Sequence, residues 1–159
     1  MNDVVYSGAS FGPPRTRVVF CTPTIVRPHD AYLASMEASV PLLEAAGYAH
    51  QICFEVGNPY ISAARANLLR KALDAKADIV VFIDHDVSWA PEDLLLLIQA
   101  PDPVAAGLYR FKKEEVEFMG ALDCAADGRP VVREDWAMRA NRVPAGFLKV
   151  TREAVAHFA

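Results

Sequence analysis

The feature that most constrains the fold is a run of five apolar residues, Ile79–Ile83, that ends directly at the sequence Asp84-His85-Asp86. The run contains no polar position, so a strand formed by it has no face suited to water. This is the pattern of a central strand that helices cover on both sides. We therefore expect residues 79–83 to form the inner strand of a sheet, with Asp84 at its carboxyl end.

Strand-like and helical segments alternate on both sides of this run. Runs typical of strands occupy residues 18–22, 50–56 and 104–108, and segments with helical spacing occupy 32–46, 61–76 and 91–99. Pro23 is expected to end the first strand and Pro41 to kink or split the first helix, because proline has no backbone N–H. The order predicts an α/β fold with a mainly parallel sheet and right-handed crossovers.

The pattern is less regular after residue 109. Residues 117–122 and 130–133 favour a small antiparallel edge around the Asp127-Gly128 turn, and residues 146–150 favour another strand. Thr151 is placed to open a helix that ends with the chain. We expect an irregular leader at residues 1–17 and a single domain at residues 18–159 that is incomplete at its carboxyl end.

Composition argues against several classes of function. A chain of 159 residues that is 53% hydrophobic has enough apolar side chains for one domain core, and a net charge of −4 provides no basic surface for nucleic acid. The three cysteines form no CxxC pair, which disfavours a disulfide framework or a zinc site and suggests the cytoplasm. No run approaches the roughly 18 apolar residues that a membrane span requires.

Asp84 and Asp86 are candidate metal ligands. Ligands of open α/β sheets bind beyond the carboxyl ends of the strands, and two carboxylates at positions i and i+2 can approach one divalent cation. Two adjacent carboxylates at a sheet edge also repel each other unless a cation or hydrogen bonds stabilise them. The alternative interpretation is a polar strand end and a turn, with His85 on the surface.

Four blocks of the sequence resemble, in the same order, blocks of GT-A glycosyltransferases, particularly family-2-like members. They lie at residues 19–24, 62–67, 77–87 and 144–148. They are similar to the first strand with its nucleotide-contacting loop, the following helix start, the strand with the DxD motif, and a glycine-aromatic strand near the acceptor. The resemblance implies a GT-A (Rossmann-like) fold and a metal-dependent transferase that moves a sugar from a nucleotide-diphosphate sugar to a hydroxyl acceptor.

The resemblance also implies roles for individual residues. Asp86 would bind Mn²⁺ or Mg²⁺ directly, and Asp84 would contact the ribose or reach the metal through water. Arg65 would bind phosphate or order the base loop, although Arg65 and Asn67 also fit an ordinary solvated helix face. The residues implied to contact the UDP- or GDP-sugar donor are Thr22, Pro23, Thr24, Arg65, Asn67 and Asp84.

A catalytic base is harder to assign. Inverting members of the family use an acidic pair after the glycine-aromatic strand, where this chain offers only Glu153 at a helix start. Glu134 and Asp135 form an acidic pair that precedes Gly146, and we consider them the base candidates. A non-catalytic nucleotide-binding or sugar-nucleotide-binding module stays open.

A sugar nucleotidyltransferase is also possible, although residues 22–24 lack the glycine-rich, basic phosphate loop usual in that class. A missing acceptor half would leave apolar surface that a second copy of the chain could cover, which suggests a homo-oligomer.

Overall fold

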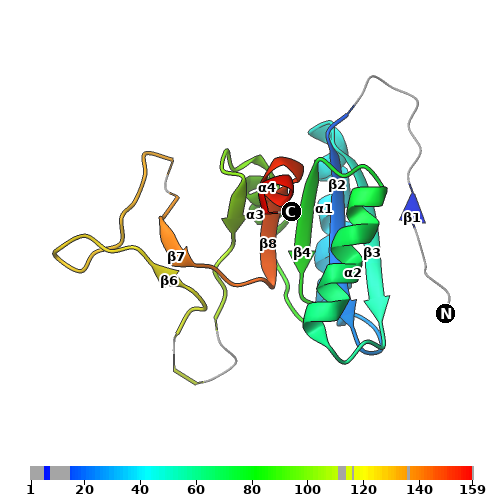
Figure 1. Ribbon diagram of the computed structural model, residues 1–159, viewed down its shortest axis with the longest axis horizontal. Coiled ribbons are helices and arrows are strands. Elements are labelled where there is room, and N and C mark those ends of the chain that lie inside the picture. The colour runs from blue at the N-terminus through cyan, green and yellow to red at the C-terminus, as the bar shows by residue number, and fades with distance from the viewer. Residues whose placement is uncertain (1–5, 8–14, 111–113, 116, 136, 159) are drawn as a thin grey trace.

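The apolar run at residues 79–83 forms an inner strand of a six-stranded sheet in the computed structural model, which describes residues 6–7, 15–110, 114–115, 117–135 and 137–158. In spatial order the strands are β1 (Tyr6–Ser7), β3 (Ala49–Val56), β2 (Arg17–Thr24), β4 (Ile79–Ile83), β8 (Phe147–Thr151) and β5 (Val104–Ala106). β2, β3, β4 and β5 run in one direction, and β1 and β8 run in the opposite direction (Figure 1). The predicted α/β fold with a mainly parallel sheet is confirmed.

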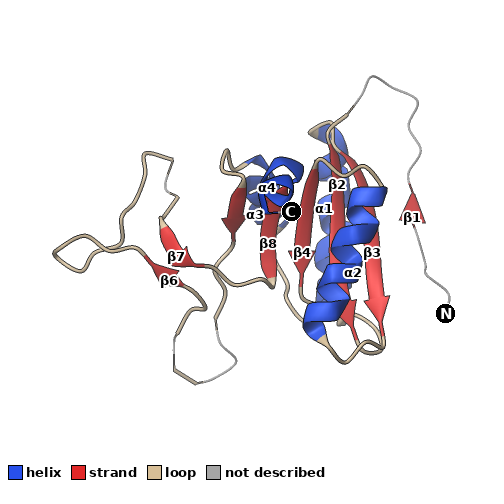
Figure 2. Cartoon of the chain, viewed as in Figure 1, coloured by secondary structure: helices blue, strands red, loops and turns tan. Residues whose placement is uncertain are grey.

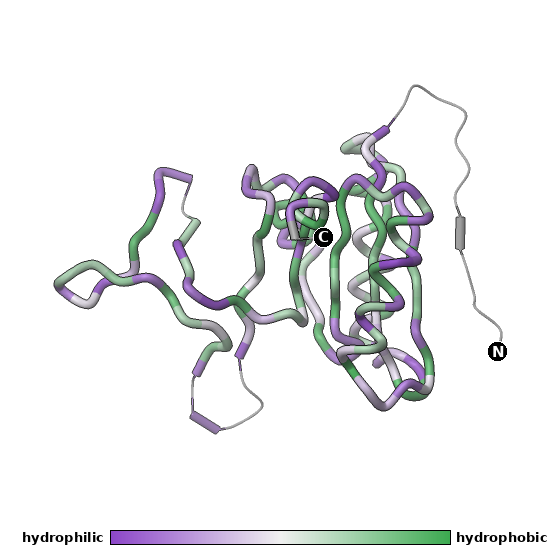
Figure 3. The backbone as a smooth tube through the Cα atoms, in the orientation of Figure 1, coloured by the Kyte–Doolittle hydropathy of each residue, from purple (hydrophilic) through white to green (hydrophobic). Residues whose placement is uncertain are grey.

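Helices cover both faces of this sheet (Figure 2). They are α1 (Asp30–Ala45), α2 (Ile61–Asp74), α3 (Pro91–Gln99) and α4 (Arg152–Phe158). Because successive side chains of a strand point to opposite faces, β2 and β4 contribute to two cores. Phe20 and Val81 belong to the core formed with α1 and α3, whereas Val19 and Val80 belong to the core formed with α2. β4 is hydrophobic along its length in Figure 3, as a strand buried on both faces requires.

The first strand does not end at Pro23, as we expected from the sequence, but continues to Thr24. The Arg17 carbonyl accepts from the Asp78 N–H, which directly precedes β4, so Arg17 and every second residue after it, including Pro23, face β4. Alternate residues of a strand direct their backbone groups to the same neighbour, so the missing N–H of Pro23 faces the β4 side. Pairing with β4 ends at Cys21, and the proline therefore removes no ladder hydrogen bond.

Pro41 does not split the first helix, since α1 runs unbroken from Asp30 to Ala45. The helix buries Tyr32, Met36 and Leu43 against the sheet, and this apolar face outweighs the one hydrogen bond that Pro41 cannot donate. The strands expected at 50–56 and 79–83 and the helices expected at 61–76 and 91–99 are confirmed, with ends that differ by two residues or fewer. The helix after Thr151 is also confirmed, and the Ala154 N–H donates to Thr151 Oγ1 at 3.2 Å.

The carboxyl-terminal third differs more from the expectation. The strand expected at 104–108 ends at Ala106 and pairs with β8, which lies antiparallel between β4 and β5. The Asp127-Gly128 turn is present, but a single bridge between Cys124 and Pro130 closes it. The paired strands of this region are β6 (Ala121–Leu122) and β7 (Ala140–Arg142), not 117–122 and 130–133. Figure 1 shows them in an arm beside the sheet, and we call residues 117–142 the arm.

The segment expected to be an irregular leader contains two paired pieces among its described residues. Tyr6–Ser7 pairs antiparallel with β3, and Arg17 already belongs to β2. Within the described ranges, no helix has the length and apolarity that crossing a membrane requires.

Candidate metal and nucleotide site

Asp84 lies where the chain leaves β4, at the edge of the sheet where β2 and β3 also end. Its N–H donates to the Gly146 carbonyl at 2.9 Å, and its own carbonyl accepts from the Val87 N–H at 3.1 Å. The first bond ties Asp84 to the start of β8, and the second turns the chain so that Asp86 stays near the same edge. The structure thus places the two predicted metal ligands beyond the carboxyl end of a buried strand, where ligands of open α/β sheets bind.

The Asp84 carboxylate is paired with Arg65 of α2. Arg65 Nη2 donates to Asp84 Oδ1 at 2.7 Å, and the two side chains are 27% and 28% exposed. Arg65 Nε is buried and has no hydrogen-bond partner among the described residues. Since a buried donor without a partner is costly, an added acceptor such as a phosphate oxygen would be favourable here.

Gly146 and Tyr109 complete the surroundings of Asp84. A Cβ at Gly146 would lie 2.2 Å from Tyr109 Oη and 2.5 Å from Asp84 Oδ2, so this position has room only for glycine. Burial and the negative charge of Asp84 raise the pKa of the Tyr109 phenol, and the charge of Asp86 acts in the same direction. The phenol therefore keeps its proton at neutral pH and is a donor, not a base.

Asp86 and His85 lie in the turn after Asp84, and both are half-buried. The His85 carbonyl accepts from the His29 N–H at 2.9 Å, and the two imidazole rings meet edge to face with centroids 5.3 Å apart. This contact fastens the loop after β4 to the loop after β2. Both histidines therefore lie on loops that leave the sheet at the edge where Asp84 lies.

Of the residues implied to contact the donor, the three at the end of β2 are buried. Thr22 is fully buried and its Oγ1 lies 2.7 Å from the hydroxyl of Tyr32, while Thr24 is 4% exposed and Pro23 is buried. A contact from the Thr22 side chain to a ligand would require this core to open. Thr24 Oγ1 is buried and has no hydrogen-bond partner in the described part of the chain, so of the two threonine hydroxyls it is the one that could still form a hydrogen bond.

Asn67, which the resemblance implied to contact the sugar-nucleotide donor, hydrogen-bonds a carboxylate of β3. Its Nδ2 donates to Glu55 Oε1 at 3.0 Å, and Lys71 Nζ donates to Glu55 Oε2 at 3.1 Å. The hydrogen bond from Asn67 is the main cause of a lowered Glu55 pKa, and Lys71 lowers it further. Asn67 is therefore part of a polar cluster between α2 and β3, about half a helical turn away from Arg65 and on a different face of the helix.

The structure does not bring Glu134 and Asp135 to Asp84. Arg133 pairs with Asp135 and, at 2.6 Å, with Asp102, which precedes β5. β4 and β5 run in the same direction, so Asp84 lies at one end of β8, level with Gly146, and Asp102 lies beyond Thr151 at the other. Strand residues rise about 3.3 Å each, which separates the two ends by roughly 17 Å.

Arg133 also affects how well Asp135 could accept a proton. Its hydrogen bond lowers the pKa of Asp135. This pairing makes that carboxylate a weak proton acceptor in addition to a distant one.

The described residues contain no group of three or more His, Cys, Asp or Glu side chains placed to hold a metal ion. Two carboxylates nevertheless suit Mg²⁺ or Mn²⁺, because such ions in nucleotide sites keep several waters and phosphate oxygens as ligands. Asp84 and Asp86 supply this donor set, although Arg65 already occupies one oxygen of Asp84. The residues present therefore fit a cation that arrives with a diphosphate better than a cation held by protein alone.

Tyr109 is a site residue that sequence reasoning missed. It follows the strand predicted at 104–108, and the rule that parallel strands end at the same edge would have placed it near Asp84.

No protein family, no curated protein and no solved structure shows a significant match to this chain.

Proposed function

We propose that this chain is a metal-dependent glycosyltransferase domain of GT-A type, which binds a UDP- or GDP-sugar and transfers the sugar to a hydroxyl acceptor. The observation that carries the proposal is the cluster formed by Asp84, Asp86 and Arg65 at the carboxyl edge of the sheet. Carboxylates beside a guanidinium provide ligands for a divalent cation and a donor for phosphate in one place.

Each group of the cluster has a distinct part in this function. A bound Mn²⁺ or Mg²⁺ would supply positive charge that stabilises the diphosphate leaving group. Asp84 and Asp86 would hold that charge at the sheet edge, and Asp86 would be the direct ligand. Arg65 can donate from its unpartnered Nε to a phosphate oxygen, and Tyr109 offers a protonated hydroxyl to the same region.

Calorimetry of UDP and GDP binding, with and without Mn²⁺, tests the proposal. We expect one nucleotide to bind in a Mn²⁺-dependent manner and Asp86→Asn to weaken that binding at least tenfold. Glu37→Gln, on the exposed surface of α1, makes the same change of charge away from the site and serves as the control. Unchanged Mn²⁺-dependent binding in Asp86→Asn would remove Asp86 from the metal site.

A specific observation also favours a second function, a non-catalytic module that binds a nucleotide or sugar nucleotide. Glu134 and Asp135 lie at the other end of the sheet, so no carboxylate of that pair can take a proton from an acceptor at Asp84. A donor-hydrolysis assay separates the two functions. Mn²⁺-dependent release of sugar supports the transferase, whereas tight nucleotide binding without sugar release supports the module.

A further inference from the structure

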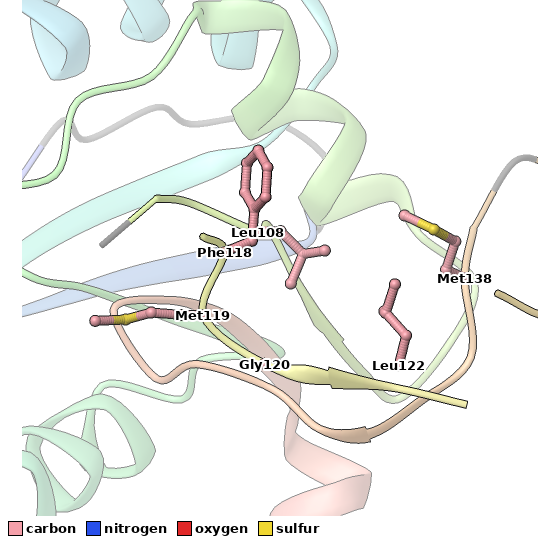
Figure 4. Close-up of a pocket in the computed structure, with 6 residues that line it drawn as sticks. All are labelled: Leu108, Phe118, Met119, Gly120, Leu122 and Met138. Carbon is pink, nitrogen blue, oxygen red and sulfur yellow. The ribbon is translucent and has the colours of Figure 1, made fainter. Parts of the chain in front are cut away.

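An apolar pocket of about 480 Å³ lies between the segment that follows β5 and the arm (Figure 4). The described residues that line it are Leu108, Phe118, Met119, Gly120, Leu122 and Met138. None of them has a side chain that could pair with a buried hydroxyl or charge, so the pocket suits hydrocarbon. Its volume lies within the range typical of small-molecule sites.

The pocket is accessible and adaptable. Phe118 is 52% exposed and Met138 is 43% exposed, so apolar side chains at the pocket reach solvent. Figure 4 shows Leu108, Leu122 and Met138 directed toward a common space. Methionine has three flexible side-chain bonds and can repack around ligands of different shape.

Two segments of the chain lead directly from this pocket to Asp84. Leu108 lines the pocket, and the next residue, Tyr109, lies beside Asp84. A Cβ at Gly120 would lie 3.2 Å from Leu108 Cδ2 and 3.7 Å from Pro144 Cδ, two residues before Gly146. Because consecutive Cα atoms are about 3.8 Å apart, the pocket is on the order of 10 Å from the carboxylate.

We propose that this pocket binds the aliphatic part of the acceptor, which is an alcohol with an extended hydrocarbon chain. The inference rests on the proposed glycosyltransferase function. The acceptor oxygen forms the new bond to the anomeric carbon, the nucleoside diphosphate leaves with the electron pair of the old bond, and the hydroxyl proton passes to water. The hydrocarbon lies among Leu108, Leu122 and Met138 while the hydroxyl extends past Tyr109 toward Asp84.

Calorimetry with a series of primary alcohols, each longer by one CH₂, tests the ligand class on the full chain. Each added CH₂ that enters the pocket should tighten binding about fourfold until the pocket is full. Leu122→Gln should weaken the longest alcohol at least tenfold. Leu96→Gln is the matched control, because Leu96 is 71% exposed on α3 and does not line the pocket. No dependence on chain length, or equal effects of the two variants, would overturn the proposal.

A transfer assay separates failure of this inference from failure of the proposed function. With Mn²⁺, a donor and a long-chain alcohol, Leu122→Gln should reduce alkyl glycoside formation tenfold, whereas Leu96→Gln should leave it unchanged. Nucleotide binding without any alcohol binding overturns only the acceptor assignment. Chain-length-dependent alcohol binding without nucleotide binding overturns the transferase and leaves the ligand class of the pocket standing.

Discussion

The substitution Gly146→Ala tests the geometry of the site without assuming any ligand. The added methyl carbon would lie 2.2 Å from Tyr109 Oη, 2.9 Å from Tyr109 Cζ and 2.5 Å from Asp84 Oδ2. Normal contacts between such atoms exceed 3 Å, so the tyrosine ring and the carboxylate must both move. Overpacking of this kind costs about 1–3 kcal/mol, and we expect the free energy of unfolding to fall by that amount.

Urea denaturation measures this loss as a lower midpoint with an unchanged slope. Tyr109→Phe removes the atom of closest contact, so the double variant Gly146→Ala/Tyr109→Phe should recover part of the stability, with a coupling energy of about 0.5–3 kcal/mol. Gly47→Ala is a matched control. Its backbone φ of +83° strains any residue other than glycine, but an added Cβ there would meet no atom within 4 Å. Gly47 also follows the carboxyl end of α1, whereas the site lies near the amino end of that helix.

Gly47→Ala should cost about 1–2 kcal/mol and leave Mn²⁺-dependent nucleotide binding unchanged, whereas Gly146→Ala should weaken that binding by displacing Asp84. If Gly146→Ala is as stable as the parent chain, or if Tyr109→Phe recovers nothing, the packing deduced around Asp84 is wrong.

Three further predictions concern polar groups in and beside the core. Thr22→Val and Tyr32→Phe should each cost about 1–3 kcal/mol in urea denaturation because each strands a buried hydroxyl, and the double variant should cost less than their sum. Asn67→Ala should lower stability at neutral pH by about 0.5–1.5 kcal/mol, because it returns the pKa of Glu55 toward its ordinary 4.5. A lowered carboxyl pKa stabilises the fold above 4.5 and loses that effect as the pH falls, so the parent and the variant should converge in acid. Lys149→Ala should lower the free energy of unfolding by about 2–4 kcal/mol at neutral pH. Lys149 is 2% exposed, and its Nζ donates to the carbonyls of Ala100 and Asp102 at 2.6 Å each. A variant as stable as the parent chain would contradict this.

The parts of the fold that the sequence predicts well are those whose local and tertiary preferences agree. Ile79–Ile83 and Pro91–Gln99 have the predicted bounds, because a short, unbroken, β-branched apolar run is typical of an inner strand and a proline with two acids favours a helix start. Pro23 was misjudged because the cost of a proline depends on which neighbour its missing N–H faces. That direction follows from sheet order, which a single sequence does not contain.

The arm shows the opposite case, in which local pattern underdetermines pairing. β6 and β7 have two and three residues, and the residues of β7 are exposed. With no buried face, alternation does not specify a register, and turn residues alone suggested the wrong partner for β6. The same uncertainty made Glu134 and Asp135 plausible base candidates, since their distance from Asp84 depends on how the arm folds back.

The pairing of Arg65 with Asp84 changes what the two carboxylates imply. From the sequence, repulsion between Asp84 and Asp86 called for a cation or for hydrogen bonds, and the structure supplies a guanidinium at 2.7 Å from Asp84. The ligand-free protein therefore needs no metal ion to offset the repulsion between the two carboxylates. A cation that binds with a diphosphate would instead compete with Arg65 for Asp84 and release the guanidinium to a phosphate. On this reasoning, Arg65→Met should strengthen binding of Mn²⁺ alone and weaken binding of the nucleotide with Mn²⁺, whereas loss of both would show that Arg65 acts only through the fold.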